Sequence, residues 1–251
     1  MSSKPQLVEL QKTLYASKNP TRRWLHCSRR DWILDVLQRY ASLSNQCALE
    51  VGPGSGLYLP TLANLFDKVI ACDIEEAYLE HATVLLPDHP NLQLLVDDMT
   101  ASRLEDNCFD LVLCTEVIEH TADSALMLAE IHRLLKPGST LILSTPQRYS
   151  PLELTAKIAF LPGIINLVHF IYQEPILATG HINLMTENEV TQQLQSAGFT
   201  ILERHKTGIY LPLIAEFTGN FGLRIEQWFE KRLCHSWLDG LLWTQYYIAQ
   251  A

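Results

Sequence analysis

The middle of the chain alternates short apolar runs with amphipathic stretches. The apolar runs are rich in Val, Ile and Leu without regular alternation, as is typical of parallel strands buried on both faces. They span 47–51, 68–72, 92–96, 109–114 and 140–145. Between them, 57–66, 75–85 and 124–135 have the periodicity of helices. Repeated β–α units of this kind predict an α/β fold with a doubly wound, mostly parallel sheet.

The flanking segments extend this pattern. Helices are expected over 7–15, 30–43, 186–197 and 225–233, and strands over 199–205 and 242–249, which brings the sheet to seven strands. Thr186 and Glu189 have the spacing of a capping box, and Asp123 is a candidate N-cap for the helix before Lys136-Pro137-Gly138.

Two segments fit this core less well. Residues 150–180 are apolar and interrupted by prolines, and 210–241 are rich in aromatic residues. Both are interpreted as insertions near the carboxyl edge of the sheet, the first an apolar helical lid after the fifth strand and the second a wall of a substrate pocket. The predicted organisation is an N-terminal helical cap, 1–46, and one main domain, 47–251.

Composition narrows the class of partner. The formal net charge is −9, and an acidic surface disfavours nucleic acid as a substrate. The start lacks the apolar core of a signal peptide, and the most apolar stretch, 158–172, is too short for a spanning helix. We expect a cytoplasmic protein with at most peripheral membrane contact. The six cysteines form no CxxC pair or zinc-ligand spacing, so reduced thiols and no metal are expected.

The most informative motif follows the first predicted strand. Glu50 precedes Gly52, Gly54 and Gly56, where the chain turns into a helix. Open α/β sheets bind ligands at this edge, and glycines allow a close backbone approach. The spacing is G-x-G-x-G, whereas a dinucleotide fingerprint, G-x-G-x-x-G, requires a glycine where Leu57 stands. A carboxylate beside the loop favours a cationic ligand such as S-adenosylmethionine (SAM) over a pyrophosphate.

Acids also end the next two strands. Asp73 ends the second strand, where a carboxylate can accept hydrogen bonds from both ribose hydroxyls. Asp97 and Asp98 follow the third strand. Thr115 and Glu116 open the run Thr115–His120 after the fourth strand.

Residues from about 47 to 146 resemble the class I SAM-dependent methyltransferase superfamily. The resemblance is closest to ubiquinone-biosynthesis-type O-methyltransferases and related small-molecule enzymes, on the motifs above and on Leu134–Gly138. It implies a Rossmann-like fold, SAM as cofactor and S-adenosylhomocysteine as product. It is weaker after Pro146, where the specificity for the acceptor usually resides.

The resemblance also implies roles for individual residues. Around the methionine part of SAM it places Glu50, Gly52, Gly54, Gly56, Thr115 and Glu116. At the ribose and adenine it places Asp73, Ile74, Asp98 and Met99. Asp98 is favoured over Asp97 for the adenine amino group. In the family an arginine before the core often reaches the SAM carboxylate, which makes His26, Arg29 and Arg30 candidates here.

The candidate catalytic residues are His181 and His120. Histidine titrates near neutral pH, so His181 is the first candidate for a general base, although a role in holding the lid is equally open. The hypothesis is metal-independent O-methylation of a small, partly hydrophobic acceptor, apolar or amphipathic, with N- or C-transfer left open. The alternatives are a nicotinamide-dependent Rossmann oxidoreductase and a non-catalytic SAM-binding protein.

Overall fold

The structure is a computed structural model that describes residues 14–41, 46–85, 89–159 and 181–251. In these residues seven strands form one sheet in the order β3-β2-β1-β4-β5-β7-β6. The strands are β1 Cys47–Val51, β2 Lys68–Asp73, β3 Leu92–Val96, β4 Phe109–Thr115, β5 Leu135–Pro146, β6 Thr200–Thr207 and β7 Thr244–Gln250. Strands β1 to β5 are parallel, and β7 pairs antiparallel with both β5 and β6. The predicted Rossmann-like, mostly parallel sheet is therefore confirmed.

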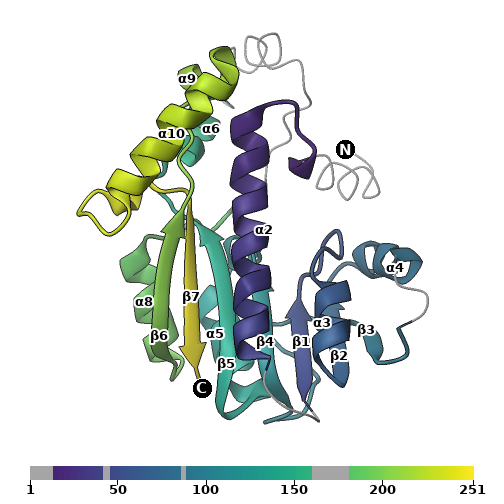
Figure 1. The fold of residues 1–251 in the computed structure, drawn as a ribbon. Helices are drawn as coiled ribbons and strands as arrows, with labels where there is room; N and C mark the ends of the chain where they lie inside the picture. The colour runs from purple at the N-terminus through teal and green to yellow at the C-terminus, as the bar shows by residue number, and fades with distance from the viewer. Residues whose placement is uncertain (1–13, 42–45, 86–88, 160–180) are drawn as a thin grey trace.

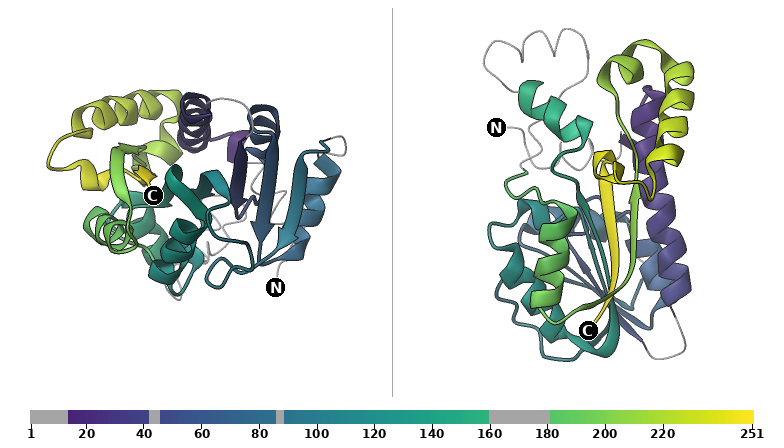
Figure 2. Two further views of the ribbon diagram at one scale, coloured as in Figure 1. Left: turned by 90° about the horizontal axis from the view of Figure 1, so that it is seen from below. Right: turned by 90° about the vertical axis from the view of Figure 1, so that its left-hand side faces the viewer.

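Helices cover both faces of the sheet (Figures 1 and 2). They are α2 Pro20–Tyr40, α3 Leu59–Leu65, α4 Glu76–Leu85, α5 Ser124–Leu134, α6 Pro151–Ala159, α8 Glu187–Ser196, α9 Pro212–Phe217 and α10 Gly219–Leu233, with short 3-10 turns η1 Ile118–His120 and η2 Asp239–Leu241. Helices α2 and α3 pack on one face of the sheet, and α5 and α8 pack on the other. Adjacent residues of β4 show the two layers: Leu111 packs toward α2, and Val112 packs toward α5.

Helix α2 begins ten residues earlier than the sequence pattern predicted. The Asn19 side chain accepts hydrogen bonds from the backbone N–H groups of Thr21 and Arg22, and Pro20 occupies the first turn. These are strong helix-start signals. The polar first half of α2 hides them, since it shows little apolar periodicity. The predicted helix over 7–15 lies mainly outside the described residues.

Other boundaries also differ from prediction. Strand β5 starts directly after α5, at Leu135, and a shift in its register with β4 between Phe109 and Leu111 accommodates the longer strand. Helix α10 starts at Gly219 rather than 225, and it packs closely on α9 at Gly222. A Cβ on Gly222 would lie 2.8 Å from the Ile214 oxygen of α9. The capping box of α8 and the Asp123 cap of α5 are confirmed.

Helix α6 is the described part of the predicted lid, and 160–180 lie outside the described residues. The lid, and the boundary between 1–46 and the main domain, stay predictions. Among the described helices, none combines the length and the hydropathy required to cross a membrane.

Candidate active site

Strand β1 ends in a buried carboxylate next to a glycine loop. Glu50 is 2% exposed, and its Oε2 has no hydrogen-bond partner among the described residues. Burial raises the pKa of Glu50 to about 8. In the loop Gly52, Gly54 and Gly56 have φ values of +65°, +51° and +72°, a region that side chains rarely adopt. A cationic ligand over this loop would stabilise the ionised form of Glu50.

The glycine loop touches the turn after β4. A Cβ on Gly52 would lie 2.6 Å from Cγ2 of Val117. Only glycine allows this approach, which places the turn Glu116–His120 beside the loop. The candidate residues of β1 and β4 thus belong to one site.

The predicted ribose and adenine residues lie at the ends of β2 and β3. Asp73 is half-buried, burial raises its pKa, and its Oδ1 accepts a hydrogen bond from the Glu75 N–H. Ile74 is 65% exposed, unusual for a large apolar side chain next to a strand. An exposed aliphatic side chain beside a carboxylate suits the two ends of a nucleoside.

Asp97 and Asp98 have different surroundings. Asp97 is buried, and its carboxylate accepts hydrogen bonds from Ser102 Oγ (2.6 Å) and Arg103 Nε (3.2 Å). Asp98 is exposed, and hydrogen bonds from Thr100 lower its pKa. Asp97 thus already has internal partners, which favours Asp98 for contact with a ligand. Met99, the next residue, is buried.

Glu116 forms an ion pair with the N-terminal helix. Its Oε2 lies 2.5 Å from Nη1 of Arg29 on α2, and its Oε1 accepts a hydrogen bond from Ser144 Oγ. Its φ of +56° is strained for a residue with a side chain. Thr115, just before it, is half-buried. The structure thus brings Glu116, from the predicted cofactor set, to an arginine 87 residues earlier.

Arg29 is held by more than this ion pair. Its guanidinium lies 5.2 Å from the ring centroid of Trp243, and its Nη2 lies 3.4 Å from Nδ1 of His26. Burial and then the charge of Arg29 lower the pKa of His26, which keeps the ring neutral. Arg30 instead pairs with Asp31 and is only partly buried. Of the three N-terminal candidates, Arg29 is the one paired with a site residue.

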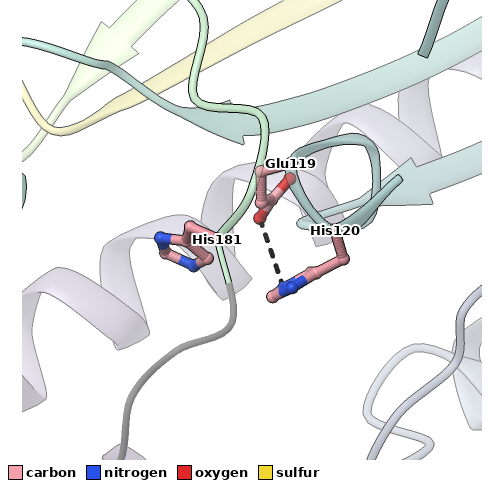
Figure 3. Close-up of side chains that lie close together, drawn as sticks. All are labelled: Glu119, His120 and His181. Atoms are coloured by element: carbon pink, nitrogen blue, oxygen red, sulfur yellow. Dashed lines mark ion pairs between the residues drawn. The ribbon is translucent and has the colours of Figure 1, made fainter. Parts of the chain in front are cut away.

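Both predicted catalytic histidines belong to one cluster with Glu119 (Figure 3). Ligand atoms of Glu119, His120 and His181 lie within 4.8 Å of one another. Glu119 is fully buried, and burial and then the charge of Glu116 raise its pKa well above the usual range. Its Oε2 accepts a hydrogen bond from Thr145 Oγ1, whereas its Oε1 has no hydrogen-bond partner among the described residues and lies 4.0 Å from Nε2 of His120.

His181 also contacts a second buried acid. Its Nδ1 lies 3.2 Å from Oε2 of Glu153 on α6, and Oε1 of Glu153 accepts a hydrogen bond from Trp243 Nε1. Sequence reasoning missed Glu153, although a single acid within the apolar run Pro151–Ala159 was a usable signal. It also placed no metal here, because it searched for Cys/His spacing and these residues are distant in the chain.

The predicted aromatic wall is not one surface. Tyr210 is buried against Leu25 and Trp243. Four other aromatic residues of the predicted wall, in α9 and α10 or after them, are exposed: Phe217, Phe221, Trp228 and Trp237. Nothing described brings these four to the histidine cluster, and their role in an acceptor pocket stays a prediction.

Comparison with known proteins tests the predicted family. Residues 49–143 match a family described as a methyltransferase domain. A probable S-adenosylmethionine-dependent methyltransferase of Mycolicibacterium smegmatis is 29% identical over 166 residues, 64% of this chain and 56% of that protein. The predicted resemblance to SAM-dependent methyltransferases is confirmed for the central part of the chain. The chain spans little more than half the length of this relative.

Two other matches cover more of both chains. The ubiquinone biosynthesis O-methyltransferase of Methylococcus capsulatus is 26% identical over 203 residues, 79% of this chain and 82% of that protein. The crystal structure of a SAM-dependent methyltransferase from Aquifex aeolicus matches with a TM-score of 0.58 at 16% identity, over 99% of this chain and 98% of that one. The second match supports the fold alone. The name of the Mycolicibacterium smegmatis relative gives S-adenosylmethionine as its cofactor, which agrees with the predicted cofactor, SAM.

Proposed function

We propose that this protein is a methyltransferase that transfers a methyl group from SAM to an oxygen of a small, partly hydrophobic acceptor. The observation that carries the proposal is Glu50, a buried carboxylate without a hydrogen-bond partner for Oε2 among the described residues, next to three left-handed glycines. A cationic ligand with no phosphate fits this loop better than a dinucleotide. The ammonium and sulfonium groups of SAM meet this requirement.

The residues that would hold the cofactor line one edge of the sheet. Around its methionine part we place Glu50, Gly52, Gly54, Gly56, Thr115 and Glu116. Around its nucleoside we place Asp73, Ile74, Asp98 and Met99. The half-buried Asp73 would accept hydrogen bonds from the ribose, and the exposed side chain of Ile74 would pack on the adenine.

When bound, SAM supplies a methyl group on a sulfonium, and its carbon–sulfur bond breaks as the acceptor oxygen bonds to that carbon. The protein must align the acceptor, and orientation of this kind can contribute up to roughly 7–11 kcal/mol. A hydroxyl acceptor must also lose its proton. His181, held at Nδ1 by Glu153, and the half-exposed His120 are the candidates to receive it. The sequence-based expectation is that no metal takes part.

An apolar acceptor suits the surroundings of the cluster. Ile182, next to His181, is 66% exposed, and Leu154, next to Glu153, is 42% exposed. Exposed aliphatic side chains beside polar groups are typical of sites for partly apolar small molecules. The similarity to an enzyme of ubiquinone biosynthesis supports O-transfer to such a compound.

Calorimetry tests the cofactor part of the proposal. S-adenosylhomocysteine should bind to the protein and NADH should not. Asp73→Ala should abolish the binding of S-adenosylhomocysteine. The control, Asp110→Asn, changes a carboxylate at the opposite end of the strands, where it pairs with Lys136, and this variant should bind nearly as wild type. Binding of NADH in place of S-adenosylhomocysteine would favour a nicotinamide-dependent oxidoreductase and refute the proposal.

Turnover tests the acceptor part. The protein is incubated with methyl-labelled SAM and a panel of phenolic, quinone-like and lipid acceptors. Label should pass to the oxygen of at least one phenolic or quinone-like acceptor. Label on nitrogen or carbon alone would refute O-transfer, and binding of SAM without transfer to any acceptor would favour a non-catalytic protein.

A further inference from the structure

We propose that Glu119, His120 and His181 form a binding site for a divalent transition metal ion next to the cofactor loop. Each residue offers one ligand atom, and these atoms lie within 4.8 Å of one another. Two imidazoles and one carboxylate suit ions such as Zn²⁺, Co²⁺ or Mn²⁺, and three protein ligands leave positions open for a substrate. The expectation of metal independence rested on sequence spacing and did not consider this set.

The unsatisfied oxygen of Glu119 is the second observation. Glu119 is 0% exposed, and its Oε1 has no hydrogen-bond partner among the described residues, although it faces the cluster (Figure 3). A buried carboxylate oxygen without a partner is costly, since it loses its hydration without replacement. A cation at the cluster would supply the missing partner.

Hydrogen bonds from neighbouring residues orient the side chains of the proposed ligands. Thr145 Oγ1 donates a hydrogen bond to Oε2 of Glu119, which leaves Oε1 for the ion. The Nδ1 of His181 faces Oε2 of Glu153 at 3.2 Å, so the ring's other nitrogen remains for coordination. A carboxylate behind a histidine ligand is a common second layer in metal sites, where it fixes the tautomer and the orientation of the ring.

The ligand atoms must approach one another to bind an ion. Metal bonds of about 2.1 Å place neighbouring ligand atoms about 3.0–3.5 Å apart. The distance from His120 Nε2 to Glu119 Oε1 is 4.0 Å, and the His120 side chain is 42% exposed. All three ligand atoms lie within 4.8 Å of one another, so binding requires them to close in by about 1–2 Å, and the half-exposed His120 ring is the least restrained of the three.

The location gives the metal a role in the proposed function. Val117, in the same turn as Glu119 and His120, contacts the glycine loop at Gly52, so the cluster borders the predicted methionine end of the cofactor. A metal there would hold the acceptor oxygen and lower the pKa of its hydroxyl group, so that the hydroxyl proton would pass to water before or during transfer. This role rests on the proposed methyl transfer, whereas metal binding itself does not. With a metal bound, His120 and His181 would be metal ligands and would not act as general bases.

Metal binding is tested on the whole chain without a tag, after a chelator has removed bound metal. Binding of Co²⁺ is followed by its visible absorption spectrum, and binding of Zn²⁺ is followed by calorimetry. One equivalent should bind with a spectrum of nitrogen and oxygen ligands. His181→Ala and Glu119→Gln should each weaken binding at least 10-fold, and Glu153→Gln about 10-fold or more. The matched controls, His89→Ala and Glu105→Gln, change a histidine and a glutamate outside the cluster and should bind as wild type.

The outcomes separate the two proposals. A variant counts as folded if it retains the far-UV circular dichroism and the S-adenosylhomocysteine affinity of the wild type. If a variant of the buried Glu119 or His181 does not fold, His120→Ala, which changes a half-exposed side chain, takes its place in the test. No metal uptake by wild type, uptake unchanged in the cluster variants, or a thiolate charge-transfer spectrum overturns the metal site while leaving the cofactor proposal intact. Failure to bind S-adenosylhomocysteine overturns the proposed function alone. If metal binds but stripped protein transfers methyl at the full rate, the catalytic role is refuted.

Discussion

At the residue scale, Glu50 links stability, pH and cofactor binding. Its pKa is about 8 in the folded chain, above the ordinary value of 4.5. The folded state therefore binds this proton more tightly than the unfolded state. The contribution of Glu50 to the free energy of unfolding thus falls as pH rises from about 4.5 to about 8, and is level above that.

Glu50→Gln should remove this dependence. We expect the ligand-free variant to be more stable than wild type by about 1–3 kcal/mol at pH 8, with little difference at pH 4.5. Urea unfolding across this pH range measures the effect, and the exposed Glu105→Gln is the control. The same variant should bind S-adenosylhomocysteine at least 10-fold more weakly. Tighter binding would show that Glu50 does not face the ammonium group.

The ion pair between Arg29 and Glu116 gives a second prediction. The two side chains are 11% and 19% exposed, so loss of one partner leaves a largely buried charge. Arg29→Met should lower the free energy of unfolding by about 2–4 kcal/mol. Arg39→Met breaks an exposed pair with Glu203 and should cost under about 1 kcal/mol. The double variant Arg29→Met/Glu116→Gln should recover part of the loss. Equal losses for the two arginines would contradict this interpretation.

Residue identities predicted part of the site. Glu50 and Asp73 could be found because each ends a strand, and the ends of parallel strands share one edge. The choice between Asp97 and Asp98 depended on where each side chain points, which the sequence does not show. The buried Asp97 bonds to Ser102 and Arg103, and this contact became visible only in the structure.

At the element scale, the loop after β1 and the turn after β4 depend on each other. Gly52→Ala should place a Cβ 2.6 Å from Cγ2 of Val117 at a φ of +65°. We expect a loss of roughly 2–4 kcal/mol in stability and at least 10-fold in S-adenosylhomocysteine affinity, measured by thermal unfolding and calorimetry.

Two further variants separate strain from collision. Gly219→Ala has a similar φ, +53°, but nothing lies within 4 Å of its Cβ, so it should cost only about 1 kcal/mol. Val117→Ala combined with Gly52→Ala should recover part of the affinity. If the two glycine variants are equally destabilised, backbone strain alone explains the effect.

The elements that the sequence predicted well are those with strong apolar runs. Strands β1 and β3 begin and end at their predicted residues, although β1 is almost entirely buried and β3, at the edge of the sheet, has no fully buried residue. Helices α2 and α10 start earlier than predicted, since the signals there are a cap, Asn19, and a close helix contact at Gly222. Such starts depend on local hydrogen bonds and tertiary packing more than on periodicity.

At the scale of the whole molecule, the histidine cluster joins segments far apart in the chain. His181 reaches Glu153 and the turn holding Glu119, and no spacing rule relates these positions. The sequence singled out His120 and His181 separately. Only the fold puts them together, because the residues just after His181 lie against the turn after β4. The backbone N–H groups of Ile182 and Asn183 both donate to the backbone carbonyl oxygen of Glu119.

Helices α2 and α10, which lie close to each other at one end of the molecule (Figure 1), are also joined by a buried hydrogen bond from Thr21 of α2 to Glu226 of α10. The Thr21 Oγ1 lies 2.5 Å from Glu226 Oε2, and Oε1 of the same carboxylate accepts the Leu211 N–H at 2.7 Å. Thr21→Val should leave one carboxylate oxygen buried without its partner. We expect a loss of about 1–3 kcal/mol.

Hydrogen exchange measures which elements lose stability in Thr21→Val. Helices α9 and α10 pack on α2 at one end of the molecule, whereas the sheet has its own core. Thr21→Val should therefore speed amide exchange in α9 and α10 more than in β1 and β4. The exposed Thr200→Val, the same change on β6, should leave α9 and α10 as in wild type. Uniformly faster exchange would instead mean that the two helices and the sheet unfold as one unit, since a local opening would spare the strands.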